Sequence, residues 1–427
     1  MGTTQSEATK FSASFALLKT RRFGTFWFAS LLSNIGTWAQ QVAQPWLLLS
    51  LGASSFMIGL DAFALGAPAF LLTLFGGVLA DRADRRRIIS VFQSIQMLCP
   101  TLLVVLLLTG TVHPWIIICL SLVVGVTDAL SMPSFQSIVP SLVERSQIAQ
   151  GLALNSIQFN LSRILGPSIA GVLLVSMGAA GCFAISALSY LPFIAVALWI
   201  LPRGKLAADA SVVADGRRPF SGARDIVADP NLRGALITVL TTSFLCSPLI
   251  TFTPVLVKES LHGDASHFSI GMASFGVGGM LGAFSLLLIS RHIDLRSFSS
   301  KLAALYGLTL VLAGLNTWTW GLPVLLIFAG SCMTASNTAA NSLLQASASP
   351  QLRGQTVSLY MLAMRGGLSA GSLLTGISVH LTGVRTALII NGCLAVAIHL
   401  YTGWVWQRAK SANGTSALAE RNENDEK

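Results

Sequence analysis

Apolar runs of about twenty residues recur along the whole chain, separated by short breaks that carry charge, glycine or proline. A helix of roughly 20 apolar residues crosses the hydrocarbon core of a bilayer, which is about 30 Å thick. The runs are apolar on nearly every side instead of alternating, which favours helices over the strands of a barrel. The pattern therefore predicts an all-α integral membrane protein with twelve transmembrane helices. The predicted spans are residues 24–49, 56–80, 88–109, 114–136, 148–176, 180–201, 233–257, 268–290, 301–317, 321–345, 354–379 and 384–406.

Composition supports this class of protein. Of the 427 residues, 53% are hydrophobic and 10% are charged, whereas soluble proteins carry about 25% charged residues. The first twenty residues are polar and lack an apolar segment with a cleavage site, so we expect no removed signal peptide. All six cysteines lie in apolar runs without the spacing of a disulfide framework or a metal site. We expect them to be small core residues, and we expect no metal.

The basic residues predict the orientation. Of the 27 lysines and arginines, 23 lie on the side of the predicted termini, and only Lys258 and Arg385 lie on the opposite side. Cytoplasmic loops carry the excess of Lys and Arg, so we expect both termini in the cytoplasm and the chain in the cytoplasmic (inner) membrane of a cell. Basic loops beside anionic lipid headgroups explain the net charge of +10 without nucleic acid as a partner.

The longest interruption divides the spans six and six. The predicted organisation is a cytoplasmic segment 1–23, a first half 24–201, a cytoplasmic loop 202–232, a second half 233–406 and a polar cytoplasmic tail 407–427. When the sequence is aligned with itself at an offset of 205 residues, Gly166 and Gly171 match Gly371 and Gly376. At an offset of 212, Gly59 falls on Gly271. The matches predict a parallel repeat, and two such halves with a binding site at their interface suit alternating access.

The segment GVLADRADRR, residues 77–86, resembles the signature between spans two and three of the major facilitator superfamily. The matching residues are Gly77, Asp81, Arg82, Arg85 and Arg86, while Asp84 stands where many members have glycine. The resemblance implies a gate in which Asp81 meets the N-terminal end of span eleven, near residues 350–355, and the arginines bind nearby acids or headgroups. The alternative is that the cluster serves only as a topology signal. RHIDLR, residues 291–296, is a fainter counterpart that predicts a weaker latch.

Span five contains RILGPSIAG, residues 163–171. It resembles the Gly-Pro-x-x-Gly-Gly motif of the exporting, antiporter branches of this superfamily, with matches at Gly166, Pro167 and Gly171 and with Ala170 replacing one glycine. Proline removes a backbone hydrogen bond and glycine permits close helix contact, so the segment is either a seal or pivot, or an ordinary packing kink. Residues 132–167 look like the bacterial branch with enterobactin exporters and macrolide efflux proteins. That branch implies efflux of amphipathic molecules, and it also includes a lysophospholipid carrier.

Away from the first two residues of each span, four charged residues fall within the spans: Asp61, Asp128, Arg163 and Arg365. A charge near the bilayer centre costs about 3 kcal/mol, so such residues face a cavity or a partner. We predict that Asp128 titrates and lies near Arg163. Asp61 is expected near water at the outer end of span two, in a helix-end role or in coupling. Arg163 and Arg365 are either structural counterions or cavity residues that contact an anionic substrate or respond to a proton.

Polar faces at helical spacing predict the lining of a central cavity. The candidates are Asn34, Thr37, Trp38, Gln41, Asn160, Asn337 and Asn341. Span one carries no acid, although many drug exporters of the superfamily have an essential acid there. The histidines lie mostly near span ends, where we expect interfacial roles.

The chain lacks a GxxxxGK[ST] loop, an HExxH motif and an acid-base constellation, so we expect neither enzymatic activity nor a cofactor. The predicted function is secondary active export of a hydrophobic or amphipathic small molecule, of drug, macrolide or siderophore type, driven by proton antiport. We expect a monomer whose partners are this substrate, protons and lipids. The alternatives are a lysophospholipid or other lipid carrier, an importer of a small metabolite, and a non-transporting receptor or scaffold.

Overall fold

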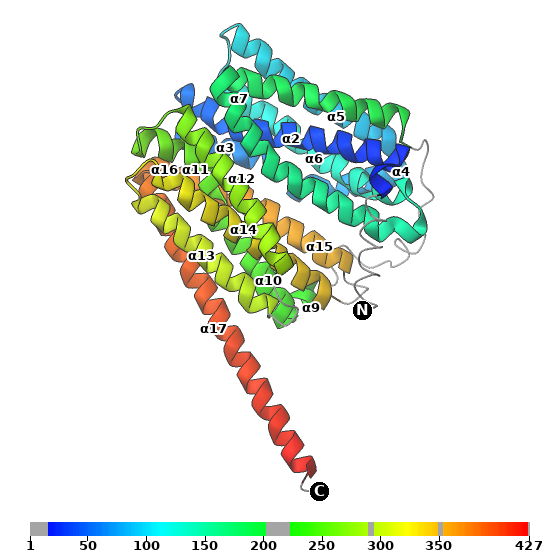
Figure 1. The fold of residues 1–427 in the computed structure, drawn as a ribbon, viewed down its shortest axis with the longest axis vertical. Coiled ribbons are helices and arrows are strands. Elements are labelled where there is room, and N and C mark those ends of the chain that lie inside the picture. Colours follow the sequence, from blue (N-terminus) through cyan, green and yellow to red (C-terminus); the bar gives the residue numbers. More distant parts are fainter. Residues whose placement is uncertain (1–15, 202–222, 289–293, 349–352, 426–427) are drawn as a thin grey trace.

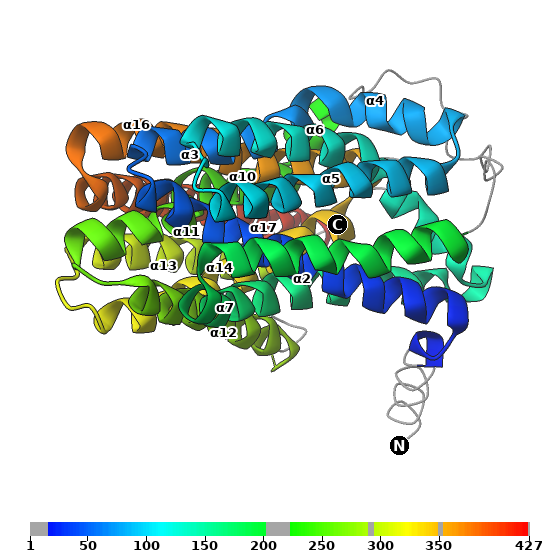
Figure 2. The ribbon, with the colours of Figure 1, turned by 90° about the horizontal axis from the view of Figure 1, so that it is seen from above.

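A computed structural model describes residues 16–201, 223–288, 294–348 and 353–425. Every regular element in these ranges is helical, and the long helices lie side by side (Figures 1 and 2). By length and composition, nine segments of the described residues can cross a membrane. One of the nine, residues 150–199, holds two predicted spans. The all-α membrane fold predicted from the sequence is confirmed.

The first six predicted spans correspond to the helices α2 to α7. Their bounds are α2 Arg21–Ser50, α3 Ser55–Gly66, α4 Pro68–Arg82, α5 Arg85–Leu108, α6 Pro114–Ile138 and α7 Ile148–Trp199, with two short turns at Val139–Leu142 and Arg145–Gln147. Span two is α3 followed directly by α4, which begins at Pro68. Spans five and six form α7, broken only at Gly178, which has φ 68° and ψ −170°. Glycine adopts this left-handed φ without the steric cost of a Cβ, so one residue reverses the chain.

The second half contains spans that are built from several shorter pieces. Span seven comprises α10 Pro230–Thr241, η3 Thr242–Cys246, α11 Pro248–Val255 and η4 Leu256–Ser260, and span eleven comprises α15 Arg353–Met361, η5 Leu362–Gly366 and α16 Gly367–Thr382. The turns η3, η4 and η5 are π-helical. The other helices are α9 Ala223–Ala228, α12 Ala265–Leu288, α13 Leu295–Leu315, α14 Gly321–Ser347 and α17 Val384–Asp425. The predicted polar tail is part of α17, which extends well beyond the bundle (Figure 1).

The two ends of the bundle are named here after the two ends of α2, the Arg21 end and the Ser50 end. In both views α3, α11 and α16 lie together at the Ser50 end (Figures 1 and 2), and Figure 1 shows the helices of the two halves diverging toward the Arg21 end. At the Ser50 end α3 crosses α16 through two glycines. A Cβ on Gly59 would lie 3.1 Å from the Cα of Gly376 and 2.5 Å from the carbonyl oxygen of Ser372. Only residues without a side chain allow this crossing.

Further contacts join the halves at the Ser50 end. The rings of Trp46 and Phe268 stack with centroids 5.1 Å apart and an interplanar angle of 13°. The Lys258 Nζ donates to the carbonyl oxygen of Leu49 at 3.4 Å. A lysine near a helix C-terminus satisfies carbonyl groups that have no partner within the helix. The Ser50 end is therefore closed in this structure.

Candidate functional site

An ion pair joins the two halves in the interior of the bundle. The Arg365 Nη1 lies 2.5 Å from the Asp128 Oδ2, and the two side chains keep 30% and 40% of their surface exposed. Asp128 comes from α6, and Arg365 comes from the π-helical turn η5. Turns of this kind occur frequently at functional sites in helices. The sequence suggested Arg163 as the charged neighbour of Asp128, but the arginine that pairs with Asp128 is Arg365, from the other half.

Arg163 of α7 has a different environment. Its Nη2 contacts the Met333 Sδ at 3.4 Å, and its guanidinium lies 5.8 Å from the ring centroid of Trp38. The Trp38 ring in turn meets Phe159 edge-on, at 6.4 Å. Since Met333 belongs to α14, this contact also bridges the halves. Among the described residues no carboxylate forms an ion pair with Arg163.

The glycine-proline motif explains why these groups meet. A Cβ on Gly166 would lie 3.1 Å from the carbonyl oxygen of Ile35 on α2 and would overlap the Cβ of Trp38. Gly166 therefore lets α7 approach α2 closely enough for Arg163 to reach Trp38. A Cβ on Gly171 would lie 2.9 Å from the carbonyl oxygen of Ser269 on α12. The motif thus packs against both halves, and Pro167 lies buried between its two contacts.

Asp61 belongs to a buried polar cluster within the first half. Its carboxyl oxygens accept from the Gln44 Nε2 at 2.9 and 2.8 Å, and the Ser121 Oγ donates to it at 2.6 Å. The cluster continues through Gln40, which accepts from the Ser186 Oγ at 2.9 Å. Asp61 is 5% exposed, so the prediction that water lies close to it was wrong. Sequence spacing did not reveal this cluster, because its members come from four different spans.

The predicted cavity residues have different environments. The Thr37 hydroxyl bonds to the Tyr190 hydroxyl at 3.0 Å and to the Ser33 carbonyl, so it joins helices of the first half. Asn34, Trp38 and Gln41 are half-buried on α2. Asn337 is 6% exposed and its Oδ1 accepts no hydrogen bond. Asn341 accepts from Gln345 within α14, and the side chain of Asn160 lies outside the described set.

The superfamily signature contains a helix cap that the sequence reading did not predict. Asp84 is the N-cap of α5 and accepts from the Arg86 backbone N at 3.0 Å. Asp294, in the fainter counterpart, caps α13 in the same way, accepting from the Arg296 backbone N at 3.1 Å. An aspartate directly before an apolar helix is a start signal that could have identified both caps. The surroundings of Gly77, the side chains of Asp81 and Arg82, and residues 349–352 lie outside the described set, so the gate stays a prediction.

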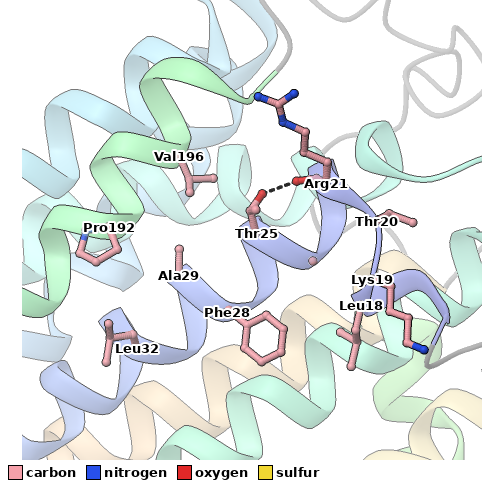
Figure 3. A pocket seen from close by; sticks show the side chains of 11 residues that line it. Leu18, Lys19, Thr20, Arg21, Thr25, Phe28, Ala29, Leu32, Pro192 and Val196 are labelled. Carbon is pink, nitrogen blue, oxygen red and sulfur yellow. Dashed lines mark hydrogen bonds between the residues drawn. The ribbon is translucent and has the colours of Figure 1, made fainter.

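A groove of about 470 Å³ lies apart from the ion pair and from Arg163, between α2 and the last turns of α7 at the Arg21 end (Figure 3). It is lined by Leu18, Lys19, Thr20, Arg21, Gly24, Thr25, Phe28, Ala29, Leu32, Pro192 and Val196. Phe28 and Leu32 are 55% and 44% exposed, as expected for side chains that face lipid. None of the charged residues within the spans lines this groove, so it is not the candidate site.

Two expectations about minor residue types need correction. All six cysteines are free, but Cys119 and Cys393 are exposed instead of lying in the core. His399 is 1% exposed and packs against α10–η3, where its Nε2 lies 3.5 Å from the Thr242 hydroxyl. An interfacial role for His399 was therefore wrong.

Two helical halves closed at one end, with an ion pair and a second arginine between them, define a membrane transporter of the major facilitator fold. The family model described as transmembrane secretion effector (MFS_3) matches residues 12–423, so the chain belongs to that family. Its members and relatives are membrane transporters and not enzymes.

The relatives include siderophore and drug transporters. The chain is 26% identical over 396 residues to the staphyloferrin A transporter of Staphylococcus aureus, covering 90% of this chain and 96% of that protein. It is 24% identical to the multidrug efflux pump Tap of Mycolicibacterium fortuitum, covering 86% of this chain and 93% of that protein. It is 24% identical to the enterobactin exporter EntS of Escherichia coli, covering 90% and 93%. The chain is thus a multi-pass membrane transporter of small molecules, and the relatives named here include an efflux pump and an exporter.

Solved structures show the same fold. A bacterial homolog of the human lysosomal transporter Spinster, inward-facing and unoccupied, matches with a TM-score of 0.70 and 17% identity, covering 92% of this chain and 97% of that one. The nucleoside transporter NupG matches with a TM-score of 0.70 and 13% identity, covering 90% and 98%. These similarities confirm the fold predicted from the sequence.

Proposed function

We propose that this protein exports a hydrophobic or amphipathic small molecule across the cytoplasmic membrane by alternating access, in exchange for protons. The observation that carries the proposal is the ion pair between Asp128 and Arg365. Each residue comes from a different half, so a rocking motion that separates the halves must break the pair. Protonation of Asp128 removes the attraction, which couples proton binding to the motion.

The direction of transport rests on the relatives and on the closed end. The relatives named above include an enterobactin exporter and a multidrug efflux pump. With the Arg21 end in the cytoplasm, as the basic residues predict, the closed Ser50 end is the outer one. The structure is then the state that loads cargo from the inside, and Asp81, Arg82, Arg85 and Arg86 form the gate that closes in the opposite state.

The experiment measures accumulation in cells that lack their own pumps. The cells express the protein, its Asp128→Asn variant or the control Asp264→Asn, which removes an acid from a loop far from the ion pair. The compounds are a lipophilic dye, a macrolide and a catecholate siderophore, each with and without a protonophore. Lower accumulation that disappears with Asp128→Asn and with the protonophore, but persists in the control, supports the proposal.

Other outcomes separate the alternatives. Export that persists after the proton gradient is collapsed rejects proton antiport. Higher accumulation of a compound than in cells without the protein identifies an importer. Unchanged accumulation of all three compounds rejects export of these classes, and labelled lysophospholipid then tests the lipid carrier.

A further inference from the structure

Arg163 carries a positive charge that no carboxylate of the described residues balances by an ion pair. The other arginine between the halves, Arg365, is neutralised by Asp128 at 2.5 Å. The contacts of Arg163 within the described residues are instead the Met333 thioether at 3.4 Å and the face of Trp38 at 5.8 Å. A thioether is a weak acceptor, and a guanidinium has five N–H donors. Most of the hydrogen-bonding capacity of this side chain is therefore unused.

The groups around Arg163 are mostly aromatic. Trp38 and Phe159 meet edge-on beside it in the first half. Tyr306 and Tyr360, in the second half, lie close enough to interact with its charge. Aromatic faces bind the flat apolar part of a ligand, and they stabilise a cation without neutralising it. The site therefore combines an unpaired cation with an apolar, aromatic lining.

One buried acceptor nearby is also unsatisfied. The Asn337 Oδ1 accepts no hydrogen bond although the residue is 6% exposed. Asn337 follows Met333 by four residues on α14, so both residues lie on one face of that helix. Buried polar groups in proteins are almost always paired. A bound molecule that donates a hydrogen bond satisfies Asn337 at the same time as its anionic group satisfies Arg163.

We propose that the transported substrate is an organic anion with a flat apolar portion, and that Arg163 is the residue that selects it. The anionic oxygens bind the Arg163 guanidinium, which matches the geometry of a carboxylate with two parallel hydrogen bonds. The apolar portion lies against Trp38, and a donor of the substrate meets Asn337. This inference rests on the proposed transport function, because it names the class of molecule that the transporter carries.

The test is equilibrium binding to the purified full-length protein of three probes that share one ring. They are 2-naphthoate, its methyl ester and 2-naphthylmethylammonium, which are anionic, neutral and cationic at neutral pH. We expect the unmodified protein to bind the anion most tightly. Arg163→Gln should weaken binding of the anion by about 10- to 100-fold and binding of the ester by less than about 2-fold.

Matched variants keep the result interpretable. Arg163→Lys retains the charge but not the paired geometry and should give an intermediate loss. Arg224→Gln removes an exposed arginine of α9 and should change nothing. Trp38→Ala should weaken the anion and the ester alike. A thermal unfolding midpoint for each variant shows that it is folded.

An unmodified protein that binds the ester as tightly as the anion overturns the inference. Equal losses for both probes in Arg163→Gln also overturn it. Because the assay measures no flux, its outcome is independent of the accumulation experiment. Anion binding without export rejects the proposed transport function alone, and export without charge preference rejects this inference alone.

Discussion

The ion pair between Asp128 and Arg365 allows a quantitative test of how the two halves are held together. Breaking a fully buried pair costs about 3–5 kcal/mol, and an exposed pair contributes about 0–1 kcal/mol. The two side chains keep 40% and 30% of their surface exposed, so this pair lies between the limits. We therefore expect Asp128→Asn to lower the free energy of unfolding by about 1–3 kcal/mol.

A second substitution isolates the pair from other effects. Asp128→Asn combined with Arg365→Gln removes both charges and leaves two amides that can bond to each other. The double variant should be less destabilised than the sum of the single variants by at least about 1 kcal/mol. Glu259→Gln, which removes an exposed acid, should change the free energy of unfolding by less than about 0.5 kcal/mol.

The assay is a detergent-induced unfolding titration of each purified variant, completed as a double-mutant cycle. Strict additivity of the two substitutions would refute the reasoning, because it would mean that the two side chains do not interact in the folded protein. A loss larger than about 3 kcal/mol for Asp128→Asn would place the pair among fully buried ones, in conflict with the exposure of its side chains.

Three further predictions follow from other contacts. Asp61→Leu removes the carboxylate that accepts from two buried donors and should lower the free energy of unfolding by about 2–5 kcal/mol in the same titration, whereas Asp61→Asn should cost less. The leucine side chain of Gly59→Leu does not fit against Gly376 where α3 crosses α16, so the substitution should separate the two helices. A cysteine placed at the Ser50 end should then react faster with a thiol reagent, and an unchanged rate would contradict the crossing. Hydrogen bonds from His267 lower the pKa of Asp264 below its ordinary value of 3.8. The ionised Asp264 therefore stabilises the start of α12 at any pH above 3.8, and this stabilisation is lost as the pH falls through the lowered pKa. The protection factor of the His267 amide, which is the intrinsic exchange rate at each pH divided by the observed rate, should therefore fall only in acid.

The fold could be predicted from the sequence because each span is a local signal. An apolar run of sufficient length must be a helix in a bilayer, since only a helix or a closed barrel satisfies its backbone there. The break at Gly178, between predicted spans ending at 176 and beginning at 180, shows how closely such signals locate a turn. The residues of the candidate site were chosen by the same kind of local signal, as charges within apolar runs, and their roles stay predictions.

The partners of these residues could not be predicted, because partnership depends on how helices distant in sequence pack together. Asp128 meets Arg365, 237 positions away, and not Arg163. Asp61 lies near the beginning of its span, yet Gln44 and Ser121 from two other helices enclose it. Depth along a helix is a local property, whereas exposure is set by the neighbours.

The π-helical turn at η5 has a consequence for how the two halves came to differ. Each residue rotates an α-helix by about 100°, so the additional residue of a π turn changes the face on which the following side chains lie. The matching segment of α7 is α-helical around Arg163, whereas Arg365 lies inside η5. An offset of 205 carries Arg163 to position 368, so the two arginines also stand three positions apart in the repeat, and they have different partners: a carboxylate for Arg365 and an aromatic face for Arg163. The two halves keep related glycines while presenting unlike groups to the space between them, because among the described residues Arg365 is paired with a carboxylate and Arg163 is not.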